Sequence, residues 1–368
     1  MSFTITKNAT DPQQVEQLID QIDFLSGLPP PLKRHFPLVI DDSIIRKPGY
    51  AEYTMLRRRS MSKSLRDLIF DGTFGEAEAL SALKNVLDFT LLELFPMRRQ
   101  QTASNITAKV HFDRFESRLP KTLRRAAELF PLISDRLERD YLRFFVKLLK
   151  ARTLYVNGKR LENAKHCLSI LRKSPEVRRR LEPKSTGTIH GDLHFDNILV
   201  NFENPSEFML IDPRGFRFPV DITYDLGKIW HSLNGLYDFI RGGYYKLDRV
   251  VFDGVGVDYS IQTVPPPTQG SLEGGGSRSG VHTVGWPFSR NVSKVYELIR
   301  QKMPGMLAKY RLIKADPNWL FRTEFAECVH FITMPIFHVD KDIKRSIVLY
   351  TRGVELMNGL MTRYGLPP

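Results

Sequence analysis

The sequence lacks the features of membrane and secreted proteins. No stretch of its 368 residues reaches the roughly 18 consecutive apolar positions that suggest a spanning helix. The N-terminus, MSFTITKNATDPQQ, does not have the basic and then apolar layout of a signal peptide. Only two cysteines occur, Cys167 and Cys328, too few for a disulfide framework or a structural zinc site. These absences predict a cytoplasmic protein in a reducing compartment, without a transmembrane segment.

Motifs for binding nucleic acid are also missing. There is no zinc-finger spacing, no RNP-type aromatic motif and no basic region followed by heptads, so we expect no nucleic-acid partner. The formal net charge of +13 nevertheless favours an anionic partner or surface. Single basic clusters, such as those at 57–59 and 178–180, can equally be solvated helix faces. Nucleotides, phosphorylated metabolites and acidic glycans all stay open on charge alone.

The first part of the chain has the pattern of a small strand-and-helix unit. Residues 2–7, SFTITK, alternate as a strand does, and residues 13–25 place their apolar side chains on one helical stripe. Two further strands are expected at 36–42 and 51–57, followed by a short helix at 64–70. This pattern predicts a first lobe at 1–58, connected by a linker near 57–62.

The remainder, 59–368, is predicted to form a larger, mainly helical lobe of an α+β protein. Its helical spacing covers most of 76–181, including 158–173, and returns in 224–240, 319–338 and 347–361. Two short strand-like runs, 197–202 and 207–212, flank a turn. The segment 255–290 is rich in Gly, Pro and Ser, and we expect a mobile insertion there.

One short segment carries the chemistry. Residues 190–197, HGDLHFDN, contain the pattern His-x-Asp-Leu-x-x-x-Asn. Phosphoryl transfer needs one carboxylate near the acceptor hydroxyl and hard oxygen ligands for a magnesium ion. Asp192 can supply the first, and Asn197 and Asp212 the second, with Asp212 placed behind an apolar run and ahead of Gly215. The alternative, a pair of Asx-turn acids beside an ordinary hairpin, needs no such spacing.

The segments IHGDLHFDNIL and LIDPRG resemble the aminoglycoside phosphotransferase and choline kinase superfamily of small-molecule kinases. The specific resemblance covers residues 185–235. It implies a protein-kinase-like, two-lobed fold that uses ATP and Mg²⁺. Asp192 would be the catalytic base, His190 would brace its loop, and Asn197 and Asp212 would be the magnesium ligands. Asp225 would tie the loop backbone to the following helix; it could also be an ordinary helix N-cap.

The same resemblance extends less specifically to the first lobe. Lys7 would contact the nucleotide phosphates, and Glu16 would be its ion-pair partner. Each could instead be a solvated surface charge. The hinge that contacts adenine through its backbone would lie at Met55, Leu56 and Arg57. Only six residues precede Lys7, so the sequence has no room there for the glycine-rich strand pair that covers the phosphates, and the first lobe looks short.

Two departures from protein kinases favour a small acceptor. Gly191 stands where those enzymes place an arginine, and no Ala-Pro-Glu segment follows Asp212. We therefore expect phosphorylation of a hydroxyl on a small molecule or glycan, most plausibly a sugar, polyol or saccharide unit. The basic charge favours an acceptor that carries phosphate or carboxylate. The alternative is a pseudokinase that serves as an interaction module, which the short first lobe favours and the intact acidic set opposes.

Overall fold

The N-terminal segment forms a sheet covered by one helix. The structure is a computed structural model that describes residues 2–101, 105–251, 255–263, 289 and 291–367. Strand β1 (Ser2–Ala9) pairs antiparallel with β4 (Tyr50–Arg58), whose other edge pairs with β2 (Leu38–Val39) and β3 (Ile45–Lys47). Helix α1 (Pro12–Ser26) follows β1, and the backbone N–H of Gln14 donates to Asp11 Oδ1 at 3.1 Å. Proline at the first helical position and an aspartate before it fix where this helix begins.

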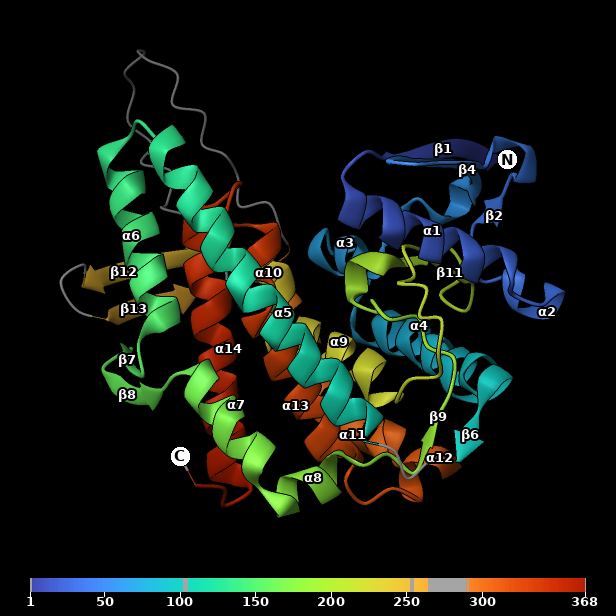
Figure 1. The fold of residues 1–368 in the computed structure, drawn as a ribbon. Coiled ribbons are helices and arrows are strands. Elements are labelled where there is room, and N and C mark those ends of the chain that lie inside the picture. The colour runs from blue at the N-terminus through green and yellow to red at the C-terminus, as the bar shows by residue number, and fades with distance from the viewer. Residues whose placement is uncertain (1, 102–104, 252–254, 264–288, 290, 368) are drawn as a thin grey trace, which may run out of the picture.

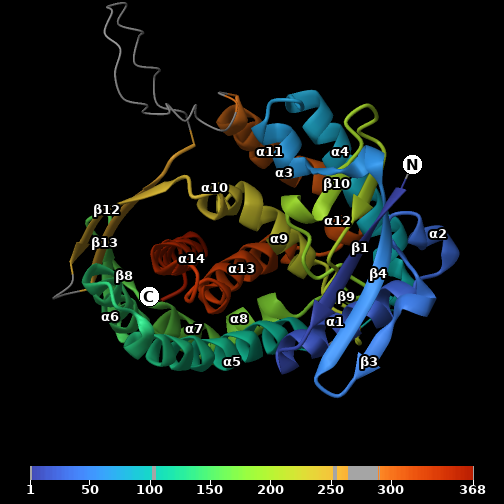
Figure 2. The same ribbon diagram turned by 90° about the horizontal axis from the view of Figure 1, so that it is seen from above.

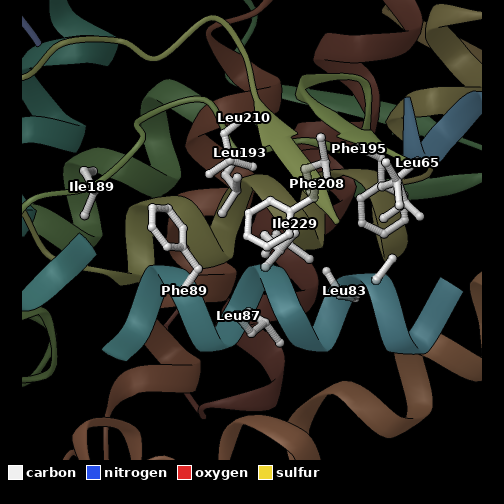
Figure 3. Close-up of a cluster of buried hydrophobic side chains, with 14 of the residues drawn as sticks. Leu65, Leu83, Leu87, Phe89, Ile189, Leu193, Phe195, Phe208, Leu210 and Ile229 are labelled. Atoms are coloured by element: carbon white, nitrogen blue, oxygen red, sulfur yellow. The ribbon is translucent and has the colours of Figure 1, made fainter. Parts of the chain in front are cut away.

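The segment after this sheet pairs with the strand that follows the loop of residues 190–197. Strand β5 (Lys63–Ser64) pairs with β10 (Ile198–Val200), which pairs in turn with β11 (Phe208–Leu210). Helix α3 (Leu65–Phe70) begins at a capping box between Ser64 and Asp67, and α4 (Glu76–Asp88) follows. Figure 3 shows Leu83 and Leu87 of α4 beneath Leu193, Phe195 and their neighbours. The apolar side chains of the loop that carries Asp192 thus pack in one hydrophobic cluster with α4.

The larger part of the molecule is helical. Figures 1 and 2 show its helices grouped beside the N-terminal sheet, with α13 and α14 at the centre of the group and α5 along one flank. The further helices are α2 (Pro30–Lys33), α5 (Ile106–Leu129), α6 (Arg136–Lys150), α7 (Ala164–Lys173), α8 (Pro175–Leu181), α9 (Thr223–Leu233), α10 (Tyr237–Arg241), α11 (Val292–Leu307), α12 (Arg311–Lys314), α13 (Trp319–Ile332) and α14 (Ile343–Arg363). The further strands are β6 (Gln100–Gln101), β7 (Thr153–Val156), β8 (Lys159–Glu162), β9 (Ser185–Thr186), β12 (Tyr245–Val251) and β13 (Gly256–Ile261).

The α+β class predicted from the sequence is confirmed, with helix predominating over strand. The buried core nevertheless crosses the predicted lobe boundary at residue 58. Ile22 and Met55 belong to the same hydrophobic cluster as Leu83 and Leu193, whereas a second cluster joins α5–α8 with α13 and α14. Both cysteines are free and buried. No helix of the described residues is long and apolar enough to pass through a membrane.

The prediction of helix at 158–173 is wrong in its first part. Strands β7 and β8 form a hairpin there, with Val156 opposite Lys159. Asn157 and Gly158 make the turn with φ of 49° and 75°. An Asn-Gly pair is the preferred sequence for such a two-residue turn, because both positions need positive φ. Helix α7 begins only after Asn163, whose side chain accepts a hydrogen bond from the backbone N–H of Ala164.

The predicted insertion at 255–290 begins in regular structure. Strand β13 occupies Gly256–Ile261, pairing antiparallel with β12 and parallel with β7. This part of the segment is therefore a strand and not a loop. Residues 264–288 and 290, which hold most of the Gly- and Ser-rich run, lie outside the described residues.

A buried carboxyl group joins two central helices and makes the first prediction. Glu327 of α13 is 1% exposed, and Asn234, just past the end of α9, contacts both of its oxygens. Burial raises the pKa of Glu327 from 4.5 to about 8. Between these pH values the folded protein keeps a proton that the unfolded chain releases, so this group lowers stability as pH rises.

The variant Glu327→Gln cannot titrate at this position. The free energy of unfolding of the variant minus that of the wild type should therefore increase as pH rises from 4.5 to 8, as measured by urea denaturation. Glu203→Gln, at an exposed carboxylate, is the control and should show a flat difference. A flat difference for Glu327→Gln as well would contradict the assignment.

Candidate active site

In the loop of residues 188–197, the neighbours of Asp192 are buried, whereas Asp192 itself is partly exposed. Leu193 and Phe195 are buried in the core, and His190 lies fully buried against the ring of Phe36, with ring centroids 6.2 Å apart. The backbone N–H of Asp192 donates to His190 Nδ1 at 3.2 Å. The side chain of Asp192 stays 31% exposed. This hydrogen bond connects the His190 ring to the backbone of the loop, and burial lowers the pKa of His190 to about 4.

Helix α9 fixes the backbone of this loop through Asp225. The Asp225 carboxylate accepts hydrogen bonds from the backbone N–H groups of His190, at 2.8 Å, and Gly191, at 2.7 Å. Gly191 has φ of +83°, and a Cβ there would lie 2.6 Å from the Cβ of Arg214. Only glycine fits this position without moving the neighbouring chain.

The carboxylate of Asp192 has a cationic partner that the sequence analysis did not identify. Lys228 Nζ lies 2.8 Å from Asp192 Oδ1, and His194 Nε2 lies 3.9 Å from Oδ2. Burial would raise the pKa of Asp192, but Lys228, His194 and Arg214 together lower it well below its usual range. Lys228 was recognisable in principle, because it follows Asp225 by three residues and so shares its helix face.

The two predicted metal ligands are held next to each other by backbone contacts. Asn197 Nδ2 donates to the backbone oxygen of Asp192 at 2.8 Å, so its Oδ1 is the atom left for a ligand. The backbone N–H of Ile211 donates to the Asn197 carbonyl at 3.0 Å and brings Asp212 beside it. Asp212 has φ of 58°, an uncommon conformation for a residue other than glycine. One amide oxygen and one carboxylate fit the hard-ligand preference of magnesium.

Lys7 reaches this site from β1, but its partner is not Glu16. Lys7 Nζ forms an ion pair with Asp212 and a hydrogen bond of 3.3 Å to Gln21 Oε1. Gln21 is buried on α1 and also contacts Tyr53 and the Pro213 carbonyl. Glu16 is exposed. Five residues on a helix turn a side chain about 140° away, so the two positions face different directions. The predicted Lys7–Glu16 pair is replaced by a Lys7–Asp212 pair.

The predicted adenine hinge lies at the end of β4. Met55 and Leu56 pair with β1 on one side and with β2 on the other. Among the described strands, Arg57 pairs with β1 alone. Arg57 is therefore the residue of this segment with an open backbone edge.

A second group of potential metal ligands includes two residues of the loop itself. Side-chain ligand atoms of His194, Asp196 and Asp238 lie within 4.8 Å of one another. Asp196 already forms ion pairs with Arg241 and with Arg66, the latter at 3.8 Å, while Asp238 accepts a hydrogen bond from a tyrosine. Two arginines pair with Asp196 and one lysine pairs with Asp212, so a metal ion at either group would have to displace a cation.

Comparison with known proteins adds little. A solved choline kinase from Cryptosporidium parvum is 11% identical and superimposes with a TM-score of 0.35, covering 97% of this chain and 80% of that chain. No protein-family model and no curated protein matches the sequence. The function therefore has to be argued from the geometry of the site.

The Asp225 contacts give the second prediction. In Asp225→Ala, two buried backbone N–H groups lose their acceptor, at a cost of about 1–3 kcal/mol each. The free energy of unfolding should therefore fall by roughly 2–6 kcal/mol, measured by urea denaturation. Asp225→Asn keeps one oxygen acceptor and should lose clearly less. Equal losses in the two variants would show that these hydrogen bonds do not hold the loop.

Proposed function

We propose that this chain is an ATP- and Mg²⁺-dependent phosphotransferase with a protein-kinase-like, two-lobed fold, which phosphorylates a hydroxyl of a small molecule. One observation carries the proposal: Asp192 is held as a carboxylate in the same hydrogen-bonded unit that presents Asn197 and Asp212. A scaffold protein has no evident need for this combination. The acceptor would be a sugar, polyol or saccharide unit.

In this proposal Asp192 orients the acceptor. Its Oδ1 is bound to Lys228, so Oδ2 is the oxygen that accepts a hydrogen bond from the acceptor hydroxyl. The hydroxyl oxygen attacks the γ-phosphorus, the bond to the β–γ bridging oxygen breaks, and the hydroxyl proton passes to Asp192. A carboxylate with a lowered pKa is a weak base, which suits a loose transition state that needs its proton removed late.

The remaining residues position the nucleotide. Asn197 and Asp212 would hold the magnesium ion, which neutralises charge on the phosphates when it is bound. Lys7 would leave Asp212 for the phosphates, while Gln21 keeps it near the site. Adenine would lie at the open edge of β4 beside Arg57, with Met55 and Leu56 behind it in the strand.

A pseudokinase is the second candidate, and one observation favours it. Lys7 is paired directly with Asp212, the charged member of the proposed metal pair. If this ion pair persists when nucleotide and magnesium are present, the metal has no charged ligand in the pair. The chain would then act as an interaction module with weak or no turnover.

The third prediction tests the role of Asp192. In Asp192→Asn, turnover should fall roughly 10²- to 10⁴-fold, the usual contribution of such a group, because no carboxylate then takes the proton of the substrate hydroxyl. ATP affinity should stay within a factor of about two. Transfer of labelled γ-phosphate to a panel of sugars, polyols and amino alcohols measures the first, and calorimetry the second.

Asp113→Asn is the matched control for this experiment. Asp113 lies exposed on α5, so the variant should keep wild-type transfer and wild-type ATP affinity. If Asp192→Asn transfers phosphate as fast as Asp113→Asn does, Asp192 is not the acceptor-orienting group.

A further inference from the structure

Three arginines near the loop that carries Asp192 have no carboxylate partner among the described residues. Arg114 and Arg118 lie one helical turn apart on α5, and Arg214 follows the Asp212 loop. Arg114 donates to the Tyr224 hydroxyl and, at 2.9 Å, to Thr333 Oγ1, and both of these acceptors are neutral hydroxyls. We call Arg114, Arg118 and Arg214 the arginine cluster.

Arg118 is the most exceptional member of the cluster. Its residue is only 5% exposed, and its Nη1 is buried without a hydrogen-bond partner among the described residues. Its guanidinium lies over the ring of Phe337, 4.7 Å from the centroid. Phe337 is itself 40% exposed, so Arg118 lies directly beneath a side chain at the surface.

The cluster contrasts with the way this fold treats another buried arginine. Arg322 is 1% exposed and forms ion pairs with both Asp221 and Asp316. For the arginine cluster, no ion pair occurs among the described residues. Burial lowers the pKa of Arg118, and the charges of Arg114 and Arg214 lower it further. An unpaired buried cation is costly, and a bound anion removes that cost.

The cluster is adjacent to the catalytic loop. The backbone N–H of Arg214 donates to the His190 carbonyl at 2.7 Å. Tyr224, the partner of Arg114, immediately precedes Asp225, which holds the same loop. Helix α5 packs on α13 within the helical group, away from the N-terminal sheet that supplies Lys7 (Figures 1 and 2). In the proposed function, the cluster would therefore lie on the acceptor side of Asp192, opposite the nucleotide side.

We propose that the arginine cluster binds a phosphate or carboxylate group of the acceptor while the acceptor's hydroxyl contacts Asp192. The inference rests on the proposed function and specifies its substrate class as an anionic hydroxy compound. Guanidinium groups match the planar, two-oxygen geometry of phosphate and carboxylate. A cationic acceptor, such as an amino sugar or an amino alcohol, would be repelled by the same charges.

The first experiment tests anion binding without requiring catalysis. Thermal denaturation is followed in sodium phosphate and in sodium chloride of equal ionic strength. Phosphate should stabilise the wild type more than chloride does. Arg118→Gln should lose this difference, and Arg124→Gln, an exposed arginine on the same helix, should keep it.

The stability without phosphate separates binding from folding. Because Arg118→Gln removes an unpaired buried charge, its melting temperature in chloride should equal or exceed that of the wild type. If phosphate stabilises a folded Arg118→Gln protein as much as it stabilises Arg124→Gln, the proposal of an anion site is overturned.

The second experiment measures transfer from ATP to glucose, glucosamine, a hexose phosphate and glucuronate. The phosphate- or carboxylate-bearing sugars should be preferred, and the better of the two identifies the anionic group. Arg118→Gln should raise the KM for that sugar roughly tenfold to a hundredfold, with the Kd for ATP unchanged. Preference for glucose or glucosamine, or a raised Kd for ATP, overturns the inference but leaves the phosphotransferase standing. Absence of ATP binding overturns the proposed phosphotransferase instead. The thermal denaturation experiment with phosphate still decides whether Arg118 binds an anion.

Discussion

The geometry of the site depends on the carboxylate of Asp225. Its two oxygens accept the backbone N–H groups of His190 and Gly191, and the side chain of Ser232 on the same helix accepts the backbone N–H of Phe195 at 3.2 Å. One turn further along the same helix, Lys228 binds Asp192. Helix α9 therefore sets both the path of the loop and the charge of its functional side chain. The buried contacts of Leu193 and Phe195 keep the loop pressed onto α4 (Figure 3).

Charge is distributed unevenly around this unit. On one side Lys7 and Asp212 are paired, so the proposed metal position is closed by an ion pair that nucleotide phosphates could open. On the other side, Arg114 contacts the hydroxyl groups of Thr333 and Tyr224, and Arg118 lies over the ring of Phe337. A protein tolerates such uncompensated charge where a ligand of opposite sign completes the site. In our proposals, the first side binds a metal–phosphate complex and the second side binds an anionic acceptor.

Sequence spacing was sufficient for the parts that local patterns determine. The segment 190–197, the strands at its end and the N-terminal strand and helix all follow from period and motif. The sequence analysis did not predict the hairpin at Asn157, because the apolar residues on both sides of its turn have helical spacing. That Gln21, and not Glu16, contacts Lys7 from α1 could not be foreseen, since the rotation of α1 about its axis is set by packing. Burial of Arg118 depends on contacts between segments far apart in the chain, which no local pattern reveals.

The central claim, that Asn197 and Asp212 hold magnesium for phosphoryl transfer from ATP, is tested most directly by calorimetric titration of ATP. The wild type should bind ATP more tightly with magnesium than with a chelator. In Asp212→Asn, which removes the only charge of the ligand pair and frees Lys7, that difference should vanish while ATP still binds. Equal affinity with and without magnesium in the wild type would contradict the account and favour the pseudokinase.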